Sequence, residues 1–446
     1  MSKIAPLSGF PEWLPEQRMI EQRVLDTIRA KFESFGFAPI ETRAVEPLEQ
    51  LLAKGETDKE IYVLRRLQAG DDEENKNLGL HYDLTVPFAR YVTQFKSELQ
   101  FPMKRYQIQK VWRGERPKEG RFREFYQADI DVVAENELPL WFDAEVPLLI
   151  HEVLRALPFP PVRLHLNNRK VLEGAGRALG LEDLTPVLRT VDKLDKIGEA
   201  GVTEALTTQL GLTASQVEPL LALTRIVTPD ASFAEKVRAL GLKHDVLDKG
   251  LDELAFVMDT LRELPEGSAV ADLHIARGFD YYTGTVYEAT LLGHEAMGSV
   301  CSGGRYDSLV GTGTGWKLPG VGISIGVSRI LGRLFGQKLL TSNRRVPTVV
   351  LVALHDEPSR KGALAVARTL RERGIAAEVF HSPVKYGKQM DYASRKGIPY
   401  VWFPPRSEGA THEVKDIRTG AQSSVDLAAW SPAESDRELR VSLATK

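Results

Sequence analysis

The sequence has a single cysteine, Cys301, among its 446 residues. One thiol cannot form an internal disulfide or a cluster of several zinc-binding thiolates, so the sequence is typical of a protein from a reducing compartment. A lone cysteine can act as a nucleophile, but it is more often a small buried side chain. The cysteine content therefore excludes a disulfide scaffold and gives no support for thiol chemistry.

Long apolar runs and a large net charge are also missing. The longest apolar stretches, such as PTVVLVAL from Pro347, are as long as a strand and too short for a bilayer span. The N-terminus has no apolar stretch of the kind that signal peptides contain. We therefore expect no membrane segment and a cytoplasmic location. The net charge of -3 neither favours nor excludes nucleic acid, and the nine histidines have no ligand-like spacing that would indicate a structural metal.

The pattern of apolar residues divides the chain into several parts. Apolar residues at helical spacing from Gln17 to about Phe35 open the first part, and helical patterns without strand signals follow over about residues 170–265. We interpret the latter as a helical insertion. Residues 336–346 are typical of a linker. Alternating β and α units over residues 347–446 then predict a separate α/β domain with a largely parallel sheet.

A β-hairpin is predicted around the turn RPKEG. MKRYQIQKVWRGE and RFREFYQADIDVV both alternate with a period of two, which gives each strand a mainly polar and a mainly apolar face. The mainly polar face comprises Gln107, Gln109, Val111, Arg113 and Glu115, then Arg123, Phe125, Gln127, Asp129 and Asp131. Such a face is usually just solvated, and a binding site is the less common alternative.

A second polar cluster occurs in LHYDLTVPFARY. Asp83 and Thr85 are two residues apart on a predicted strand or extended loop, so both side chains should project the same way. A carboxylate beside a hydroxyl could hold an ammonium group. An Asx-type turn ahead of the proline explains the same residues equally well.

Two further clusters combine aromatic and charged side chains. ARGFDYYTGTVYE brings Arg277, Tyr281 and Tyr282 together around two glycines, which is poor material for a plain core and indicates a pocket for a charged ligand. In CSGGRYDSL the paired glycines let the backbone approach a ligand or a neighbouring strand. Arg305 and Asp307 of this stretch could simply pair with each other.

The stretch GVGISIGVSRIL is the last candidate. Gly320, Gly322 and Gly326 leave one strand face bare beside Arg329, which suits a flat base and a phosphate chain, although tight helix packing would explain the same glycines. Another glycine-rich stretch, GTGTGWKLPG, lacks the Gly-Lys-Ser/Thr ending of a Walker A loop, and no G-x-G-x-x-G follows a strand to open a helix. These two nucleotide-binding motifs are therefore excluded.

At these stretches the chain resembles the class II aminoacyl-tRNA synthetases, and specifically the histidyl-tRNA synthetase family. VWRGERPKEGRFREF is similar to the second class-defining motif and GVGISIGVSRIL to the third. ARGFDYYTGTVYE and SGGRYD resemble two stretches peculiar to the histidine enzymes, and VLRTVDKLDKIGEAGV resembles their helical insertion. KYGKQMDYASRKGIPYV and VKDIRTG are similar to their anticodon-binding domain. The resemblance covers essentially the whole chain.

The resemblance implies a fold and an activity. The fold is α+β: a class II antiparallel sheet flanked by helices over residues 1–335, with the insertion at about 170–265, and a C-terminal α/β anticodon-binding domain over 347–446. The activity is that of a histidine–tRNA ligase, which activates L-histidine with ATP and Mg²⁺ and transfers it to the 3′ end of histidine tRNA. A homodimer is implied as well. The alternative is a non-catalytic histidine-binding relative, like the regulatory subunit of ATP phosphoribosyltransferase, but such relatives lack the anticodon domain and tend to lose the phosphate-binding arginines.

The resemblance also implies roles for single residues. Asp83, Thr85 and Gln127 match the positions that hold the α-ammonium, Asp131 and Tyr282 those that contact the imidazole, and Tyr281 and Tyr306 those that line its pocket. Arg113, Arg121 and Arg329 match the arginines on the ATP phosphates, Glu115 and Phe125 the positions that hold adenine, and Arg277 the extra arginine at the α-phosphate. Arg113 and Arg277 are therefore the expected catalytic residues, in contact with both histidine and the α-phosphate.

Some positions depart from the family pattern. Arg43 stands where the first motif, which builds the dimer interface, normally has a proline, and Ser328 stands where the third motif usually has a glutamate. Ser302 and Ser308 flank GGRYD where glycines are common. The expected tRNA surface comprises Arg368, Arg371, Arg373, Lys385, Lys388, Arg395 and Lys396, although at least half of these could be solvated helix faces.

Overall fold

The computed structural model describes residues 4–52, 58–67, 77–275, 281–307, 309, 316–407 and 410–444. The chain forms two compact units. The large unit contains residues 1–11 and 27–336, and the small unit contains residues 12–26 and 337–446. None of the described helices is long and apolar enough to cross a membrane.

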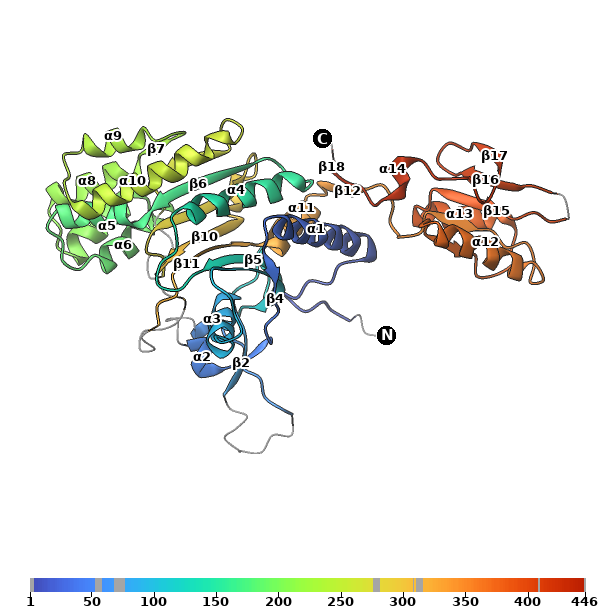
Figure 1. Ribbon diagram of the computed structural model, residues 1–446, viewed down its shortest axis with the longest axis horizontal. Helices are drawn as coiled ribbons and strands as arrows, with labels where there is room; N and C mark the ends of the chain where they lie inside the picture. Colours follow the sequence, from blue (N-terminus) through green and yellow to red (C-terminus); the bar gives the residue numbers. More distant parts are fainter. Residues whose placement is uncertain are drawn as a thin grey trace. The chain divides into compact units, whose positions relative to one another are not determined.

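A nine-stranded sheet forms the centre of the large unit (Figure 1), with the strand order β1-β4-β5-β11-β10-β9-β6-β8-β7. The strands are β1 Ala38–Pro39, β4 Met103–Trp112, β5 Glu124–Val133, β6 Val162–Asn168, β7 Val227–Thr228, β8 Ala269–Asp272, β9 Thr285–Leu291, β10 Cys301–Tyr306 and β11 Gly320–Ile325. The pairs β1–β4 and β6–β8 are parallel, and the other pairs in the described sheet are antiparallel. The predicted α+β fold with a mainly antiparallel sheet is confirmed.

Helices alternate with these strands along the chain. They are α1 Pro15–Ser34, α4 Trp141–Ala156, α5 Arg169–Ala178, α6 Thr185–Val191, α7 Leu194–Glu204, α8 Ala214–Thr224, α9 Phe233–Arg238, α10 Asp245–Thr260 and α11 Val327–Gly336. Helices α4 and α10 pack against β6, and α11 packs against β5 (Figure 1). The two-residue strand β7 lies among α5 to α10, where the sequence predicted helices alone, because two residues are too few to produce a periodic pattern.

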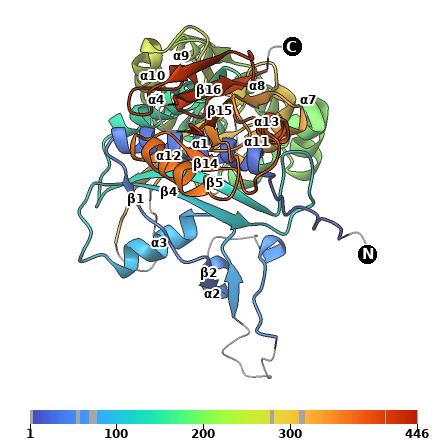
Figure 2. The same ribbon diagram turned by 90° about the vertical axis from the view of Figure 1, so that its right-hand side faces the viewer.

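A small group of elements lies beside the hairpin and contains the Asp83 cluster (Figure 2). It comprises α2 Leu48–Leu52, β2 Val45–Pro47, β3 Leu78–Leu80 and α3 Thr85–Gln94. The prediction of a strand or extended loop at Thr85 is wrong, because α3 begins at this residue. The Asp83 Oδ1 accepts a hydrogen bond of 3.0 Å from the Val86 N–H, which is a local turn like the one considered as the alternative.

The β4–β5 hairpin has the predicted register. Gln107 pairs with Asp129, Gln109 with Gln127 and Arg105 with Asp131, so the side chains of these pairs share one face. Gln107 is 0% exposed, and Asp129 and Asp131 are each 5% exposed. The interpretation of this face as merely solvated is therefore wrong. Buried polar groups need partners, and this requirement makes the face a candidate binding site.

The small unit is built on a five-stranded sheet of order β14-β13-β15-β16-β17. The strands are β13 Val350–Val352, β14 Ala377–Val379, β15 Tyr400–Phe403, β16 His412–Asp416 and β17 Gln422–Val425, and the main helices are α12 Arg360–Glu372 and α13 Tyr386–Lys396. β14, β13 and β15 are parallel as predicted, whereas β16 and β17 extend the sheet antiparallel. Trp402 is fully buried at the centre, with its ring 5.4 Å from that of Trp430.

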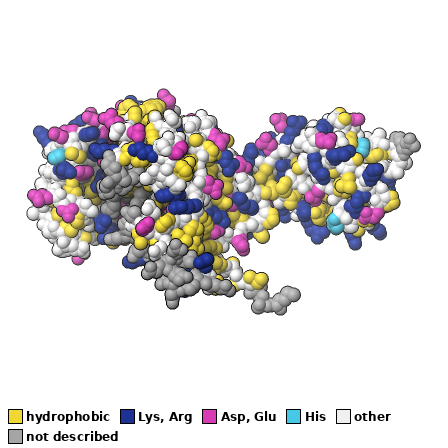
Figure 3. Space-filling model, turned by 60° about the horizontal axis from the view of Figure 1, so that its bottom comes forward, with side chains coloured by type: hydrophobic (Ala, Val, Ile, Leu, Met, Phe, Trp, Pro, Cys, Tyr) yellow, Lys and Arg dark blue, Asp and Glu magenta, His cyan; other side chains and the backbone are white. Residues whose placement is uncertain are grey.

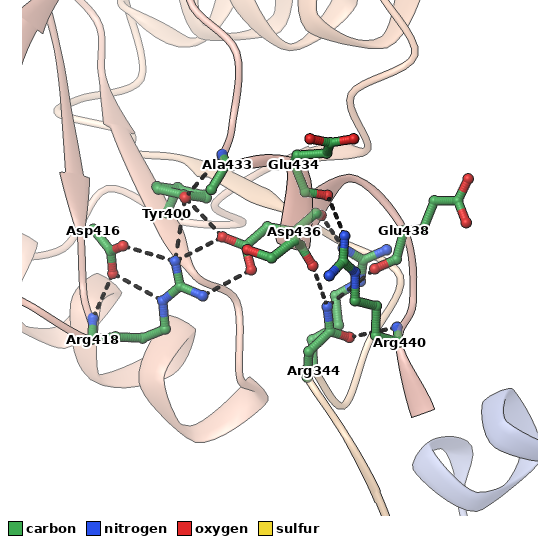
Figure 4. A network of polar contacts seen from close by, with 11 residues as sticks. Arg344, Tyr400, Asp416, Arg418, Ala433, Glu434, Asp436, Glu438 and Arg440 are labelled. Carbon is green, nitrogen blue, oxygen red and sulfur yellow. Dashed lines mark hydrogen bonds and ion pairs between the residues drawn. The ribbon is translucent and has the colours of Figure 1, made fainter. Parts of the chain in front are cut away.

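A polar network fastens the end of the chain to this unit (Figure 4). Asp436, in α14 Glu434–Arg437, accepts hydrogen bonds of 2.8 Å from both Arg418 and Tyr400. Arg418 also binds Asp416 at 2.8 Å, and Arg344 donates to the Asp436 carbonyl at 2.6 Å. Strand β18 Val441–Leu443 then pairs antiparallel with β12 Leu340–Ser342. The last residues of the chain are thus joined to the segment that follows the large unit.

The network predicts a pH-dependent contribution to stability. We expect Arg418→Ala to lower the free energy of unfolding by about 1–2 kcal/mol near pH 7, because Asp436 is buried but solvent screens the half-exposed guanidinium. Hydrogen bonds from Arg418 lower the pKa of Asp436 and of Asp416. A lowered carboxyl pKa contributes stability that is present above the unfolded pKa and is lost as the pH falls through the folded one.

Urea unfolding followed by tryptophan fluorescence at pH 7 and at pH 3 measures this difference. The difference in the free energy of unfolding between wild type and Arg418→Ala should be smaller at pH 3 than at pH 7. Arg395→Ala is the matched control, since its guanidinium is exposed and donates only to the Asp391 carbonyl among the described residues. A gap that stays constant between the two pH values would contradict the assignment.

Candidate active site

A cavity of about 440 Å³ opens on the polar face of the hairpin. Its walls come from the turn between β4 and β5, from β5, β9, β10 and β11, and from the start of α11. Seven sequence-predicted site residues line it: Arg113, Glu115, Arg121, Phe125, Gln127, Tyr282 and Arg329. Its volume lies in the range typical of small-molecule sites, about 300–1,000 Å³.

A smaller hollow of about 40 Å³ adjoins this cavity. Its lining includes Thr85, Asp131, Tyr281, Tyr282 and Tyr306, all predicted site residues. Tyr282, Ser302 and Ser324 line both spaces, so the two are neighbours across these side chains. Asp83 lines neither space, and Arg277 lies outside the described residues.

Arg113 is held at the end of β4 by its own backbone and side chain. Its N–H donates to the Arg123 carbonyl at 2.9 Å, and its Nε donates to the Tyr82 carbonyl at 2.9 Å. The guanidinium carbon lies 5.3 Å from the centre of the Phe125 ring. The terminal nitrogens have no other hydrogen-bond partner among the described residues, and a guanidinium anchored through Nε can present both of them to an anion.

The two other arginines of the cavity are also oriented. Arg121 forms an ion pair of 3.2 Å with Glu115, and both lie beside the hairpin turn. Arg329, in the first turn of α11, donates from Nη2 to the Met297 carbonyl. Three guanidinium groups therefore line one cavity, which makes it a site for an anion.

Three tyrosines form the wall of the smaller hollow. The rings of Tyr281 and Tyr306 stack with centroids 5.1 Å apart, and the Tyr282 ring meets Tyr281 edge-on at 5.2 Å. Burial, followed by the charge of Asp131, raises the pKa of all three hydroxyls. They therefore stay protonated and can donate hydrogen bonds at neutral pH.

Two carboxylates lie on the floor of this hollow. Asp131 Oδ2 pairs with Arg105 at 2.5 Å, and its Oδ1 accepts from the Tyr306 hydroxyl at 2.9 Å. Asp129 lies two residues away on β5, and burial raises its pKa to about 7, against the opposing effect of Arg105. The sequence prediction did not include Arg105. The same period-two pattern extends from Gln107 to this residue, so the signal was present.

Gln127 lines the larger cavity and contacts Ser324, which lines both spaces. Its Nε2 donates to the Ser324 hydroxyl at 2.8 Å, while its Oε1 is buried and has no hydrogen-bond partner in the described part of the chain. A buried amide oxygen without a partner is unfavourable unless a ligand supplies a donor. An ammonium group is a donor of the required kind.

The glycines of β10 and β11 make room for these side chains. A Cβ atom on Gly322 would collide with the Asp131 carboxylate, and one on Gly320 would collide with the Tyr306 ring. The sequence predicted that these glycines leave the strand face bare, either for a flat base or for helix packing. At these two positions the prediction is wrong, because side chains of this chain fill the space. The register explains why, because Gly322 pairs directly with Asp131 across β11 and β5.

Arg305 does not form the pair with Asp307 that the sequence suggested as an alternative. It pairs with the buried Asp143 of α4 through two nitrogens, at 2.5 and 2.9 Å, and not with Asp307. Asp307 accepts from the Thr283 hydroxyl at 2.8 Å instead. The Arg305–Asp143 pair joins β10 to α4, a long-range contact that local sequence cannot reveal.

The residues that depart from the family pattern have partners of their own. Ser328 is buried, and its hydroxyl accepts from the Tyr126 N–H at 2.8 Å, which ties α11 to β5. Arg43 pairs at 2.7 Å with the buried Glu46, which Arg90 binds at the same distance. Ser308 lies outside the described residues.

Comparison with known proteins agrees with this geometry. The family model "Histidyl-tRNA synthetase" matches residues 9–330, and "Anticodon binding domain" matches residues 348–431. The chain belongs to the histidyl-tRNA synthetase family. Members of this family are aminoacyl-tRNA synthetases with ATP as a substrate, and the predicted family, class and C-terminal domain type are confirmed.

Individual relatives support the same family. The histidine–tRNA ligase of Thermobifida fusca is 54% identical over 95% of this chain and 97% of its own length. The crystal structure of histidyl-tRNA synthetase from Nostoc sp. PCC 7120 has a TM-score of 0.85 and 37% identity, covering 95% of this chain and 97% of that one. A Bacillus halodurans structure described as an ATP phosphoribosyltransferase regulatory subunit/histidyl-tRNA synthetase shares the fold, with a TM-score of 0.73 and 20% identity over 89% of this chain and 97% of its own.

Proposed function

We propose that this protein is a histidine–tRNA ligase that joins L-histidine to the adenylyl group of ATP with release of pyrophosphate, and then passes the histidyl group to the 3′ end of histidine tRNA with release of AMP. One observation carries the proposal: a cavity with three arginines adjoins a hollow lined by tyrosines and a carboxylate. The first suits a triphosphate, and the second suits a polar aromatic side chain. Gln127, in the larger cavity, offers an acceptor for the α-ammonium.

In the first step, a histidine carboxylate oxygen attacks the α-phosphorus of ATP. A mixed anhydride forms, and the bond to the pyrophosphate oxygen breaks. Two anions must meet, so catalysis depends on positioning and on donors fixed around the phosphoryl oxygens. Arg113, directly after β4, would supply such donors, and Arg277 is proposed to supply others. Tyr282 and Asp131 would bind the imidazole, while Arg121, Arg329, Glu115 and Phe125 would hold the rest of ATP.

Magnesium is proposed as the metal that accompanies ATP. Among the described residues, no group of three or more His, Cys, Asp or Glu side chains could hold a metal ion alone. Mg²⁺ at nucleotide sites needs only one or two carboxylates, with phosphate oxygens and water completing its shell. Glu288 lines the cavity and fits this requirement. When bound there, the ion would neutralise charge on the outer phosphates.

The non-catalytic regulatory role is the less supported reading. The chain carries an anticodon-binding domain match over residues 348–431, and its cavity keeps Arg113, Arg121 and Arg329. Both features favour catalysis. The deciding experiment is histidine-dependent exchange of labelled pyrophosphate into ATP, run beside other amino acids. Folded protein that exchanges nothing with histidine would refute the proposal.

Two lysines are the best candidates for the proposed tRNA surface, because the other basic side chains have contacts within the protein. Of the seven basic candidates, Arg371 and Arg373 donate to backbone carbonyls, Arg395 does the same within α13, Lys396 lies 4.6 Å from the Tyr392 ring centre, and Arg368 faces Glu372. Lys385 and Lys388 are exposed at the start of α13. On the face in Figure 3, basic side chains of the small unit are interspersed with acidic and apolar ones.

These two lysines give a prediction. We expect Lys385→Glu with Lys388→Glu to raise the KM for tRNA and to lower the slope of log affinity against log salt by about 1 for each lost phosphate contact. Histidine-dependent pyrophosphate exchange should not change. Aminoacylation at several salt concentrations measures the effect. Lys361→Glu, an exposed lysine on α12 outside the proposed surface, is the control.

The proposed assembly is a homodimer. The family's first motif builds the dimer interface, and here the matching stretch carries Arg43, paired with the buried Glu46. Sedimentation of the purified protein tests this proposal.

A further inference from the structure

Arg105 is a fully buried guanidinium beneath the proposed histidine pocket. It is 0% exposed, and its Nη2 lies 2.5 Å from Asp131 Oδ2. Its Nη1 donates to Gln107 at 3.3 Å, and its central carbon lies 4.2 Å from the centre of the Phe88 ring. The ion pair, the hydrogen bond and the ring contact hold the guanidinium in place, whereas its Nε and Nη2 form no hydrogen bond of good geometry among the described residues. No bulk water screens its charge from Asp131.

The pair determines how Asp131 meets a ligand. A lone buried carboxylate would draw a proton onto a neighbouring imidazole and bind it as a cation. Here Oδ2 has a counter-charge and Oδ1 accepts from the Tyr306 hydroxyl, so Asp131 keeps its ability to accept a hydrogen bond without carrying an uncompensated charge.

We propose that Arg105 is a specificity-determining positioning residue, which pairs with Asp131 so that the pocket selects the neutral form of the substrate imidazole. This inference rests on the proposed function, because it takes histidine as the occupant. The Arg105 guanidinium does not touch the substrate. It acts by fixing and neutralising the carboxylate that does.

The other charged groups around the hollow agree with this selection. The titratable groups that line it are Asp129 and Asp131 on β5, Tyr281 and Tyr282, and Tyr306 on β10, and the nearby charges that act on them are those of Arg105 on β4 and Asp83 ahead of α3. Burial raises the pKa of Asp129 to about 7, so it is mostly uncharged in mild acid. The tyrosines are neutral, and the proposed role of Asp83 is to balance the α-ammonium. In mild acid no uncompensated charge is then left, among these groups, to favour an imidazolium.

Proton release on histidine binding tests the inference in the wild-type protein. A histidine side chain in a peptide has a pKa of about 6.5, and that of free histidine is somewhat lower, so binding of the neutral form should release most of one proton at pH 5.5 and about 0.1 or less at pH 7.5. Titration calorimetry in two buffers of different ionisation enthalpy gives this number. The affinity should also fall several-fold between pH 7.5 and pH 5.5. Binding without proton release at pH 5.5 overturns the inference, whereas no histidine binding at all overturns the proposed function.

Variants distinguish the effect of Arg105 from the titration of Asp129. Asp129→Asn should release the same number of protons, and loss of the release in this variant would trace it to Asp129 and overturn the inference. Arg105→Met leaves Asp131 without its counter-charge, so proton release at pH 5.5 should fall to less than half. Arg105→Lys keeps a cation there and should restore it. If Arg105→Met does not fold, the wild-type and Asp129→Asn titrations still decide the matter.

Discussion

Arg113→Gln is expected to lower kcat for histidine-dependent pyrophosphate exchange by about 100- to 1,000-fold, the usual loss when one fixed donor to a developing oxyanion is removed. Arg113 is anchored through Nε to the Tyr82 carbonyl, and its backbone is anchored to Arg123. Its terminal nitrogens therefore need no reorganisation when charge develops on the α-phosphoryl oxygens. Glutamine keeps some polarity but loses both the charge and the two-pronged geometry.

The measurement is exchange at saturating histidine and ATP, with KM determined separately for each. Arg116→Gln is the matched control, because Arg116 is an exposed arginine three residues further along the hairpin and does not line the cavity. A loss in kcat with KM values near those of wild type would indicate an interaction made mainly in the transition state. Equal loss in both variants would mean that general charge, and not this position, matters.

Local patterns in the sequence predict much of this fold. The period-two alternation of β4 and β5 predicts both strands and the face that each residue occupies, since neighbours in a strand alternate strictly. The helix α1 and the alternating β14, β13, β15 part of the small unit follow from the same kind of local signal. The antiparallel addition of β16 and β17 does not, because pairing direction is decided by the turns and by the core.

The side-chain contacts of the site are harder to predict from the sequence, because they join strands that are far apart along the chain. Arg105 and Asp131 meet only when β4 pairs with β5, and Arg305 meets Asp143 only when β10 packs near α4. The burial of the polar face is likewise a property of the assembled sheet. Residue types and spacing indicate which side chains carry chemistry, whereas their partners depend on the tertiary structure.

Gly322 makes a tertiary contact of this kind, and its substitution should disturb the histidine pocket. Gly322 lies opposite Asp131 on β5 and opposite Gly304 on β10. A methyl group there would meet the Asp131 carboxylate and the Ile130 carbonyl. Because a paired strand cannot shift far, the carboxylate must leave its position between Arg105 and Tyr306. We therefore expect Gly322→Ala to raise the KM for histidine by about 100-fold or more, as expected when a buried polar pairing with the substrate is lost.

Overpacking of this kind also lowers the stability of the fold, by about 1–3 kcal/mol, so the melting temperature is measured alongside exchange. Gly326→Ala is the matched control on the same segment, because its added methyl would find no atom nearer than 3.4 Å. The control should keep its melting temperature and its KM for histidine. A Gly322→Ala protein with the wild-type KM would contradict the role of Asp131 in recognition, since the carboxylate cannot stay in place beside the new methyl group.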